Sequence, residues 1–210
     1  IENEFVDNAE HLAKLKEIAV ECGFIAPIYT VTGWNSASGA KIPIDEVVPV
    51  FGGYCEAPWE NHMNRLSPSP HYFFNRMRND SAIGTDLIAK TQSDGWQLPY
   101  ERYPFATCEL GGGIEVTHHR RPIIKPMDIY AVSLVKLGDG NNLVGYYMYH
   151  GGTNKIGELS TFNETKATGY PNDYPILSYD FQAPLSEYGE VREQRHRDRK
   201  SGSAGMPRPI

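Results

Sequence analysis

The stretch YPFATCELGGG, residues 103–113, resembles a mostly apolar strand that ends in a carboxylate and three glycines. Three further stretches follow the same plan: FIAPIYTVTGW at 24–34, VVPVFGGY at 47–54 and NLVGYYMYHGGTN at 142–154. Apolar runs of this length are typical of strands buried on both faces of a parallel sheet. Each run closes in glycine, aromatic or acidic residues, so polar chemistry is expected at the carboxyl ends of these strands.

Helical patterns separate the strands. Residues 8–22 have apolar side chains at helical spacing, and Gly23 follows where a helix C-cap belongs. The stretch 125–138 has a proline in its first turn and a glycine at its end, and 71–84 is predicted to be a third, poorly capped helix. This alternation predicts an α/β protein with a parallel sheet. A doubly wound sheet stays possible, although no G-x-G-x-x-G follows any strand.

The same pattern suits a (β/α)8 TIM barrel, in which the active site lies at the carboxyl ends of the strands. The chain begins IENEF, which resembles the end of a strand rather than its start. Counting it gives about five strands where a barrel needs eight, so the barrel interpretation expects roughly the first three and a half βα units to be missing. Glu4 and Glu109 would then lie on the same rim of the barrel, at the carboxyl ends of its strands.

Two carboxyl groups on one rim are what hydrolysis of a glycosidic bond requires. In the retaining mechanism one protonates the leaving oxygen and the other attacks the anomeric carbon, at a separation of roughly 5 Å. Spacing alone is a weak signal, because most acidic residues at strand ends are solvated loop residues. A non-enzymatic α/β protein in which Glu4 and Glu109 are incidental therefore stays open.

Four motifs add to this reading: IENE at 1–4, CELGGG at 108–113, YYMYHGGTN at 146–154 and LSYDFQAPLSEYGE at 177–190. In this order they resemble glycoside hydrolase family 35, the retaining β-galactosidases. The resemblance runs from residue 1 to about 192. It implies that residues 1–190 are the C-terminal portion of the catalytic TIM barrel, about strands 4–8. Residues 191–210 are expected to be a polar, disordered tail.

The resemblance also implies roles for individual residues. Glu4 would be the general acid/base, and Asn3 would hydrogen-bond the sugar 2-hydroxyl. Glu109 would be the nucleophile, with the Tyr147 hydroxyl pointing at it. Tyr179, from the stretch that closes the sugar pocket, would contact the substrate.

The chain departs from the family in two places. Phe181 would also line the pocket, but many relatives have SYDYDAP where this chain has SYDFQAP, so a hydroxyl that could reach the sugar is lost. Recognition of a sugar hydroxyl depends on such partners, which weakens the case for galactose in particular. At 110–122 the sequence LGGGIEVTHHRRP replaces an aromatic-rich run, so the leaving-group side of the pocket must differ.

The function implied is hydrolysis of terminal non-reducing β-D-galactose from an oligosaccharide or glycan, with no cofactor and no metal. Two alternatives stay open within the family. The chain could be a catalytically incompetent fragment with at most weak sugar binding, because the first strands of the barrel normally supply walls of the pocket. It could also act by the same mechanism as an exo-β-glucosaminidase or β-glucosidase.

Composition argues against other classes of partner. The net charge of −6 and the lack of a basic stripe before the tail argue against nucleic acid. No apolar run approaches the roughly 20 residues that span a bilayer. The three cysteines are widely spaced and match neither a disulfide framework nor a zinc pattern. Adjacent His118 and His119 would point opposite ways, so no shared metal site is expected there. The sequence leaves the compartment open.

Overall fold

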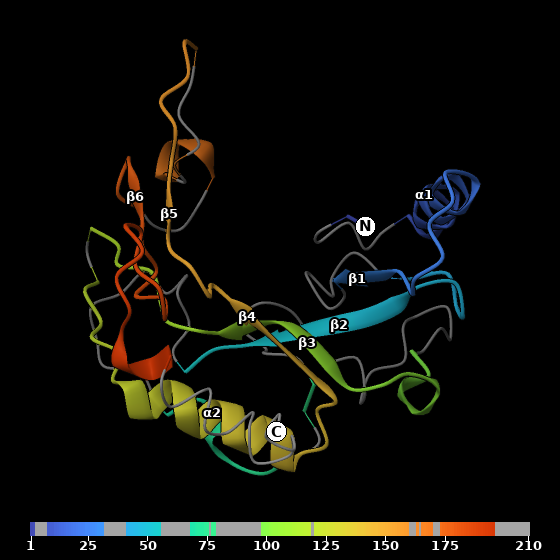
Figure 1. Ribbon diagram of the computed structural model, residues 1–210, viewed down its shortest axis with the longest axis horizontal. Coiled ribbons are helices and arrows are strands. Elements are labelled where there is room, and N and C mark those ends of the chain that lie inside the picture. Colours follow the sequence, from blue (N-terminus) through green and yellow to red (C-terminus); the bar gives the residue numbers. More distant parts are fainter. Residues whose placement is uncertain are drawn as a thin grey trace, which may run out of the picture.

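Four parallel strands form the central sheet, in the order β1-β2-β3-β4 (Figure 1). They are β1 (Tyr29–Val31), β2 (Val48–Gly53), β3 (Ala106–Gly111) and β4 (Leu143–Tyr147). The computed structural model describes residues 1–2, 8–31, 41–55, 68–75, 77–78, 98–118, 120–159, 163, 165–169 and 173–195. Because sequential strands pair side by side and in parallel, the α/β prediction is confirmed. Closure of the sheet into a TIM barrel stays a prediction.

Two helices lie where the sequence predicts them. In α1 (Ala9–Glu21) the Asn8 side chain accepts a hydrogen bond from the His11 N–H, which satisfies one free donor of the first turn. Gly23 follows with a φ of +86°, the left-handed conformation that ends many helices. In α2 (Pro126–Gly138) the direction is reversed, because the first-turn Asp128 carboxylate accepts from the N–H of the N-cap residue Lys125.

The prediction of a helix over 71–84 is wrong in the part that the structure describes. A 3-10 turn, η2 (Pro70–Tyr72), is followed by residues 73–75 and 77–78 outside any helix. The Asn75 side chain donates to the carbonyls of Pro70 and Phe73 and accepts from the Met77 N–H. An asparagine amide that satisfies nearby backbone groups competes with helical hydrogen bonding, which explains the failure.

The stretch 24–34 also differs from expectation. It was predicted as one continuous strand buried on both faces, yet in its described part, residues 24–31, only Tyr29–Val31 form a strand, β1. Residues 32–34 lie outside the described residues. Ile25 is 98% exposed and Tyr29 is 54% exposed. Pro27 precedes the strand and cannot donate a ladder hydrogen bond, so pairing begins after it. By contrast β2 is buried from Pro49 onward, as predicted.

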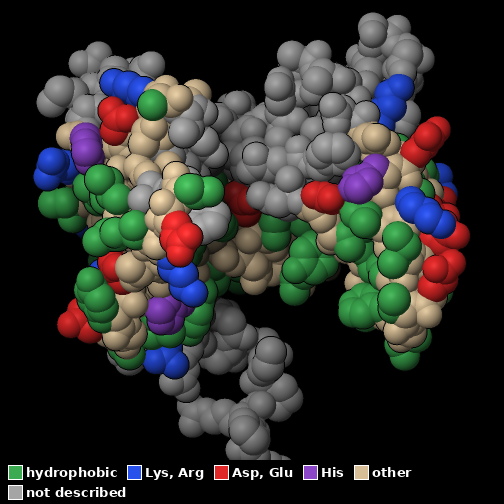
Figure 2. All heavy atoms as spheres, turned by 90° about the horizontal axis from the view of Figure 1, so that it is seen from above, with side chains coloured by type: hydrophobic (Ala, Val, Ile, Leu, Met, Phe, Trp, Pro, Cys, Tyr) green, Lys and Arg blue, Asp and Glu red, His purple; other side chains and the backbone are tan. Residues whose placement is uncertain are grey.

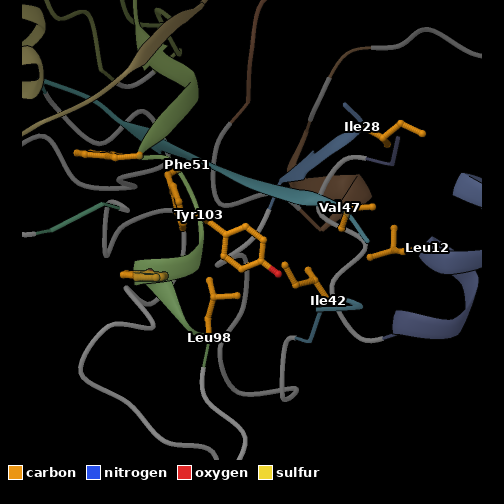
Figure 3. Packing of buried hydrophobic residues seen from close by; sticks show 9 residues of the cluster. Leu12, Ile28, Ile42, Val47, Phe51, Leu98 and Tyr103 are labelled. Carbon is orange, nitrogen blue, oxygen red and sulfur yellow. The ribbon is translucent and has the colours of Figure 1, made fainter. Parts of the chain in front are cut away.

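The largest core cluster packs α1 against the part of the sheet formed by β1 and β2 (Figure 3). Leu12 of α1 and Phe51 of β2 are fully buried, and the cluster combines residues of a helix, a strand, a 3-10 turn and the loops between them. Its members are Leu12, Ile28, Ile42, Val47, Phe51, Leu98, Tyr100, Tyr103 and Phe105. Each fully buried side chain of this size contributes about 1.5–3 kcal/mol, so this region is well anchored.

A second cluster holds α2 against one face of the sheet, where Figure 1 shows the helix running below β3. Leu110 of β3 packs with Ile129 and Val132 of α2 and with Cys55. Leu110 and Ile129 are both 0% exposed. Leu110, the residue next to Glu109, therefore anchors β3 on α2.

A small antiparallel pair, β5 (Gly152–Thr153) with β6 (Ser178–Tyr179), extends away from the sheet (Figure 1). The chain then returns to the carboxyl end of β4, where Leu185 exchanges backbone hydrogen bonds with Tyr149 and Gly151. The other 3-10 turns among the described residues are η4 (Tyr100–Arg102) and η5 (Lys166–Thr168). This return places residues 179–185 beside the sheet edge where the functional residues are expected.

Charges of both signs mix on the surface. At the end that carries α1, acidic, basic and histidine side chains lie close together (Figure 2). Examples are the pairs of Lys14 with Glu17 at 2.7 Å and of His11 with Glu2 at 2.9 Å. In the described part of the chain, no helix has the length and apolarity needed to cross a bilayer.

Candidate active site

Glu109 lies near the carboxyl end of β3, in a locally irregular part of the sheet. The pairing of β3 with β4 shifts register between Thr107 and Leu110, and that of β2 with β3 shifts between Phe51 and Gly52. Both irregularities flank Glu109, which pairs with Gly52. Such bulges re-aim side chains and are common beside active sites. The Glu109 side chain is directed into the protein, and the residue is only 7% exposed.

The buried carboxyl group has a defined hydrogen-bond donor. The Tyr54 hydroxyl, directly after β2, donates to Glu109 Oε2 at 3.1 Å. Burial, and then the negative charge of Glu109, raise the pKa of Tyr54 well above its ordinary value, so this hydroxyl keeps its proton. A buried carboxylate is costly unless it is hydrogen-bonded, and a hydroxyl that stays protonated stabilises its ionised form. The site is therefore suited to holding Glu109 as an anion.

An aromatic cluster surrounds this pair. The Phe181 ring packs edge-on against Tyr147 with centroids 5.2 Å apart, and lies 5.8 Å from Tyr179 and 6.2 Å from Tyr54. The hydroxyls of Tyr147 and Tyr179 are 3.0 Å apart and hydrogen-bonded. Tyr147, Tyr179 and Phe181, predicted as site residues from two separate motifs, thus meet in one cluster, and Tyr54 connects that cluster to Glu109.

Sequence reasoning missed the part that Tyr54 plays. It expected a tyrosine hydroxyl on the nucleophile, but from Tyr147, and the structure shows Tyr54 donating to Glu109. The Tyr147 hydroxyl is hydrogen-bonded to that of Tyr179, and a role of Tyr147 toward Glu109 stays a prediction. One signal could have found Tyr54: it ends VVPVFGGY, the strand that precedes the Glu109 strand.

Glycines after Glu109 let other segments approach closely. A Cβ on Gly112 would lie 2.3 Å from the Met148 carbonyl oxygen, and one on Gly113 would lie 2.0 Å from the Phe181 carbonyl oxygen. Both distances are too short for a side chain, and the opposing atoms are backbone. The GGG of CELGGG therefore brings the end of β4 and the loop after β6 into contact with the residues that follow Glu109.

Other reactive groups nearby are poor alternatives. Burial, and then the charge of Glu109, raise the pKa of Cys108 to about 12, so this thiol stays protonated and is a weak nucleophile. His118 is exposed, and His119 lies outside the described residues. No three His, Cys, Asp or Glu side chains of the described part come together as a metal site would require.

Asn3 and Glu4 lie outside the described residues, so the separation of the Glu4 and Glu109 carboxyl groups stays a prediction. The two residues before them lie beside β1. The Ile1 amino group donates to the Tyr29 carbonyl at 2.8 Å, and the Thr30 hydroxyl donates to the Glu2 carbonyl at 3.3 Å. Ile1 and Glu2 therefore lie alongside the β1 edge of the sheet.

A model of a known protein family matches this chain over most of its length. The model described as "Glycosyl hydrolases family 35" matches residues 1–203. The match includes every residue of the site described above.

Proposed function

Because the chain belongs to family 35 of the glycosyl hydrolases, we propose that it removes terminal non-reducing β-D-galactose from oligosaccharides or glycans. The proposed mechanism is retaining, with Glu109 as nucleophile and Glu4 as general acid/base. The observation that supports it most is the buried Tyr54–Glu109 pair, because a nucleophilic carboxylate must be ionised and fixed in direction.

In the first step, a Glu109 carboxylate oxygen attacks the anomeric carbon as the bond to the leaving oxygen breaks. The Glu4 carboxyl gives its proton to that oxygen, so the leaving group departs as a neutral alcohol. A covalent glycosyl ester on Glu109 results. Tyr54, which donates to Oε2, would hold the carboxylate so that its other oxygen faces the sugar.

In the second step, a water molecule attacks the same carbon and Glu4 takes its proton. The ester bond breaks, Glu109 leaves as a carboxylate, and the sugar keeps its β configuration after two inversions. The two carboxyl groups must stand roughly 5 Å apart for this sequence. Placement of Ile1 and Glu2 beside β1 supports Glu4 as the partner, since Glu4 is only two residues after Glu2.

The sugar site is proposed to lie between Glu109 and the hydroxyls of Tyr147 and Tyr179, with Asn3 on the 2-hydroxyl. Phe181 is 3% exposed and has no hydroxyl, so its part in the pocket is to pack the tyrosines. Galactose specificity therefore has to come from other side chains. Hydrolysis of a β-glucoside or β-glucosaminide by the same residues is the alternative activity to test.

Two measurements test the proposal on the full chain. Proton NMR during hydrolysis of an aryl β-galactoside should show the β-anomer first, and initial appearance of the α-anomer would contradict retention. A panel of β-galactoside, β-glucoside and β-glucosaminide should give the highest kcat/KM for the galactoside. No turnover of any glycoside would favour a chain that is catalytically incompetent.

A further inference from the structure

Two consecutive residues beside the site have an unusual backbone. Phe181 has a φ of +56° and Gln182 a φ of +47°. Left-handed conformations are uncommon for residues other than glycine, especially bulky ones, and they persist where the surroundings fix them. We call these two residues the 181–182 turn. Its contacts show what fixes it and what it touches.

The Gln182 side chain ties the turn to the loop that follows β3. Its Nε2 donates to the Ile114 carbonyl at 3.1 Å and to the Pro122 carbonyl at 2.9 Å, and its Oε1 accepts from the Ile124 N–H at 3.2 Å. Three of the four hydrogen bonds that an amide side chain can make are therefore used on one loop. A single side chain fixes the distance between two segments about 60 residues apart.

The backbone of the turn is held as well. Gln194, itself buried, donates from Nε2 to the Gln182 carbonyl at 2.8 Å. On the other side, a Cβ on Gly113 would lie 2.0 Å from the Phe181 oxygen and 2.5 Å from the Gln182 oxygen. The turn thus lies directly against the chain four residues after Glu109.

The turn also reaches Glu109 by a second route. The Phe181 ring packs on Tyr54 and Tyr147, and the Tyr54 hydroxyl donates to the carboxylate. A shift of the 181–182 turn would therefore move both the loop that follows Glu109 and the Tyr54 hydroxyl that donates to its carboxylate.

We propose that Phe181 and Gln182 are positioning residues for Glu109. The Gln182 amide fixes the turn on the 114–124 loop, and the turn holds the Phe181 ring against Tyr54 so that its hydroxyl meets the carboxylate. This inference rests on the proposed function for its catalytic consequence, but the geometry it describes can be tested without turnover.

The first test replaces Gln182 by Met, which has a similar length and makes none of the three amide hydrogen bonds. Misplacement of the nucleophile should lower kcat about tenfold with little change in KM. The acidic limb of the pH–rate profile should move to higher pH, because a weakened Tyr54 hydrogen bond stabilises the ionised carboxylate less. An acidic limb that stays in place would overturn the proposal.

The chain offers a matched control. The Asn75 amide makes the same set of bonds, donating to two carbonyls and accepting from one N–H, in the loop beside α2. Asn75→Leu should lower the melting temperature and leave the acidic limb in place. If Asn75→Leu moves the limb as much as Gln182→Met does, the effect is general loosening and the proposal fails.

Two further variants keep the test decisive. Gln182→Asn tolerates a left-handed backbone but is one methylene too short, so it should shift the limb in the same direction even if Gln182→Met folds poorly. The double variant Tyr54→Phe/Gln182→Met should be less than additive in kcat, since both changes act through the same hydrogen bond. Full additivity would contradict the proposed route.

A readout independent of activity separates this inference from the proposed function. Carbon-13 NMR of carboxyl-labelled glutamate follows the Glu109 titration, with the signal assigned by its loss in Glu109→Gln. Among the described titratable groups, Tyr54 and Cys108 interact with Glu109, and their raised pKa values keep both neutral below pH 9. The midpoint should rise in Gln182→Met even in a chain without turnover. An unmoved midpoint overturns the positioning role whatever the activity.

Discussion

The Tyr54 hydroxyl lies 3.1 Å from Oε2 of Glu109, and both residues are buried. The pair joins the ends of two neighbouring parallel strands, so the strand pairing itself brings donor and acceptor together. A hydrogen bond to a buried carboxylate contributes about 1.5–3 kcal/mol, which is enough to bias both its ionisation and its direction. The proposed chemistry depends on this contact.

Tyr54→Phe removes the donor and keeps the ring. We expect kcat to fall by about 10²-fold and the acidic limb of the pH–rate profile to move to higher pH. The sign follows from the hydrogen bond: it favours the ionised carboxylate, so the pKa of Glu109 rises when it is lost. The contribution of this hydrogen bond to the free energy of unfolding is present at pH values where the Glu109 carboxylate is ionised. It is lost as the pH falls and the carboxylate is protonated.

Tyr103→Phe is the matched control for that variant. Tyr103 is also a buried tyrosine, but its hydroxyl accepts from the Asp45 N–H in the core cluster of α1. We expect a modest loss of stability and an unchanged pH–rate profile. A shift of the acidic limb equal to that of Tyr54→Phe would show that the Tyr54 contact has no special role.

Glu109→Gln removes the nucleophile and keeps the shape of the side chain. We expect kcat to fall by roughly 10⁴-fold or more while a substrate analogue still binds within about threefold, because the amide cannot form the glycosyl ester. Steady-state kinetics and calorimetric titration check the two halves of this prediction. An active Glu109→Gln enzyme would refute the assignment of the nucleophile.

Glu4→Gln tests the acid/base role through the leaving group. A dinitrophenyl galactoside needs no proton on its leaving oxygen, so its glycosylation step should be affected little. An alkyl or sugar leaving group should lose about 10²–10⁴-fold in kcat/KM. The alkaline limb of the pH profile should also disappear. Equal losses for both substrates would place general acid catalysis on another residue.

Gly113→Ala tests the close contact between the loop that follows β3 and the 181–182 turn. Because the added Cβ would meet backbone oxygens at 2.0 and 2.5 Å, the chain must shift, and we expect a loss of about 3 kcal/mol in the free energy of unfolding. Gly152→Ala is the control, since its Cβ would find nothing nearer than 3.7 Å. Urea denaturation compares the two. Equal stabilities would mean that the contact is not this tight.

The helices α1 and α2 and the strand β2 could be predicted because their signals are local. For the helices, the apolar spacing lies within the element, and the terminal glycine lies in it or directly beyond its end. The wrong prediction of a helix at 71–78 also has a local cause. The Asn75 side chain donates to carbonyls of its own loop, and these hydrogen bonds compete with those of a helix.

The arrangement of the site was predictable only in part. The strand ends and family motifs point to Glu109, Tyr147, Tyr179 and Phe181, and the structure brings them into one region. The position of Tyr54 at the end of the preceding strand made it a candidate, but its hydrogen bond to Glu109 could not be predicted from that position alone, because it depends on register shifts in the sheet. The backbone conformation of the 181–182 turn could not be predicted either, because contacts with distant loops fix it.

The most direct test of the central claim is to trap the glycosyl-enzyme. Incubation with a dinitrophenyl 2-deoxy-2-fluoro-β-galactoside, followed by proteolysis and mass spectrometry, identifies the residue that attacks the anomeric carbon. We predict one fluorosugar per chain, esterified to Glu109, with slower labelling in Tyr54→Phe and none on Glu109 in Glu109→Gln. A label on any other residue of an active enzyme would contradict Glu109 as the nucleophile.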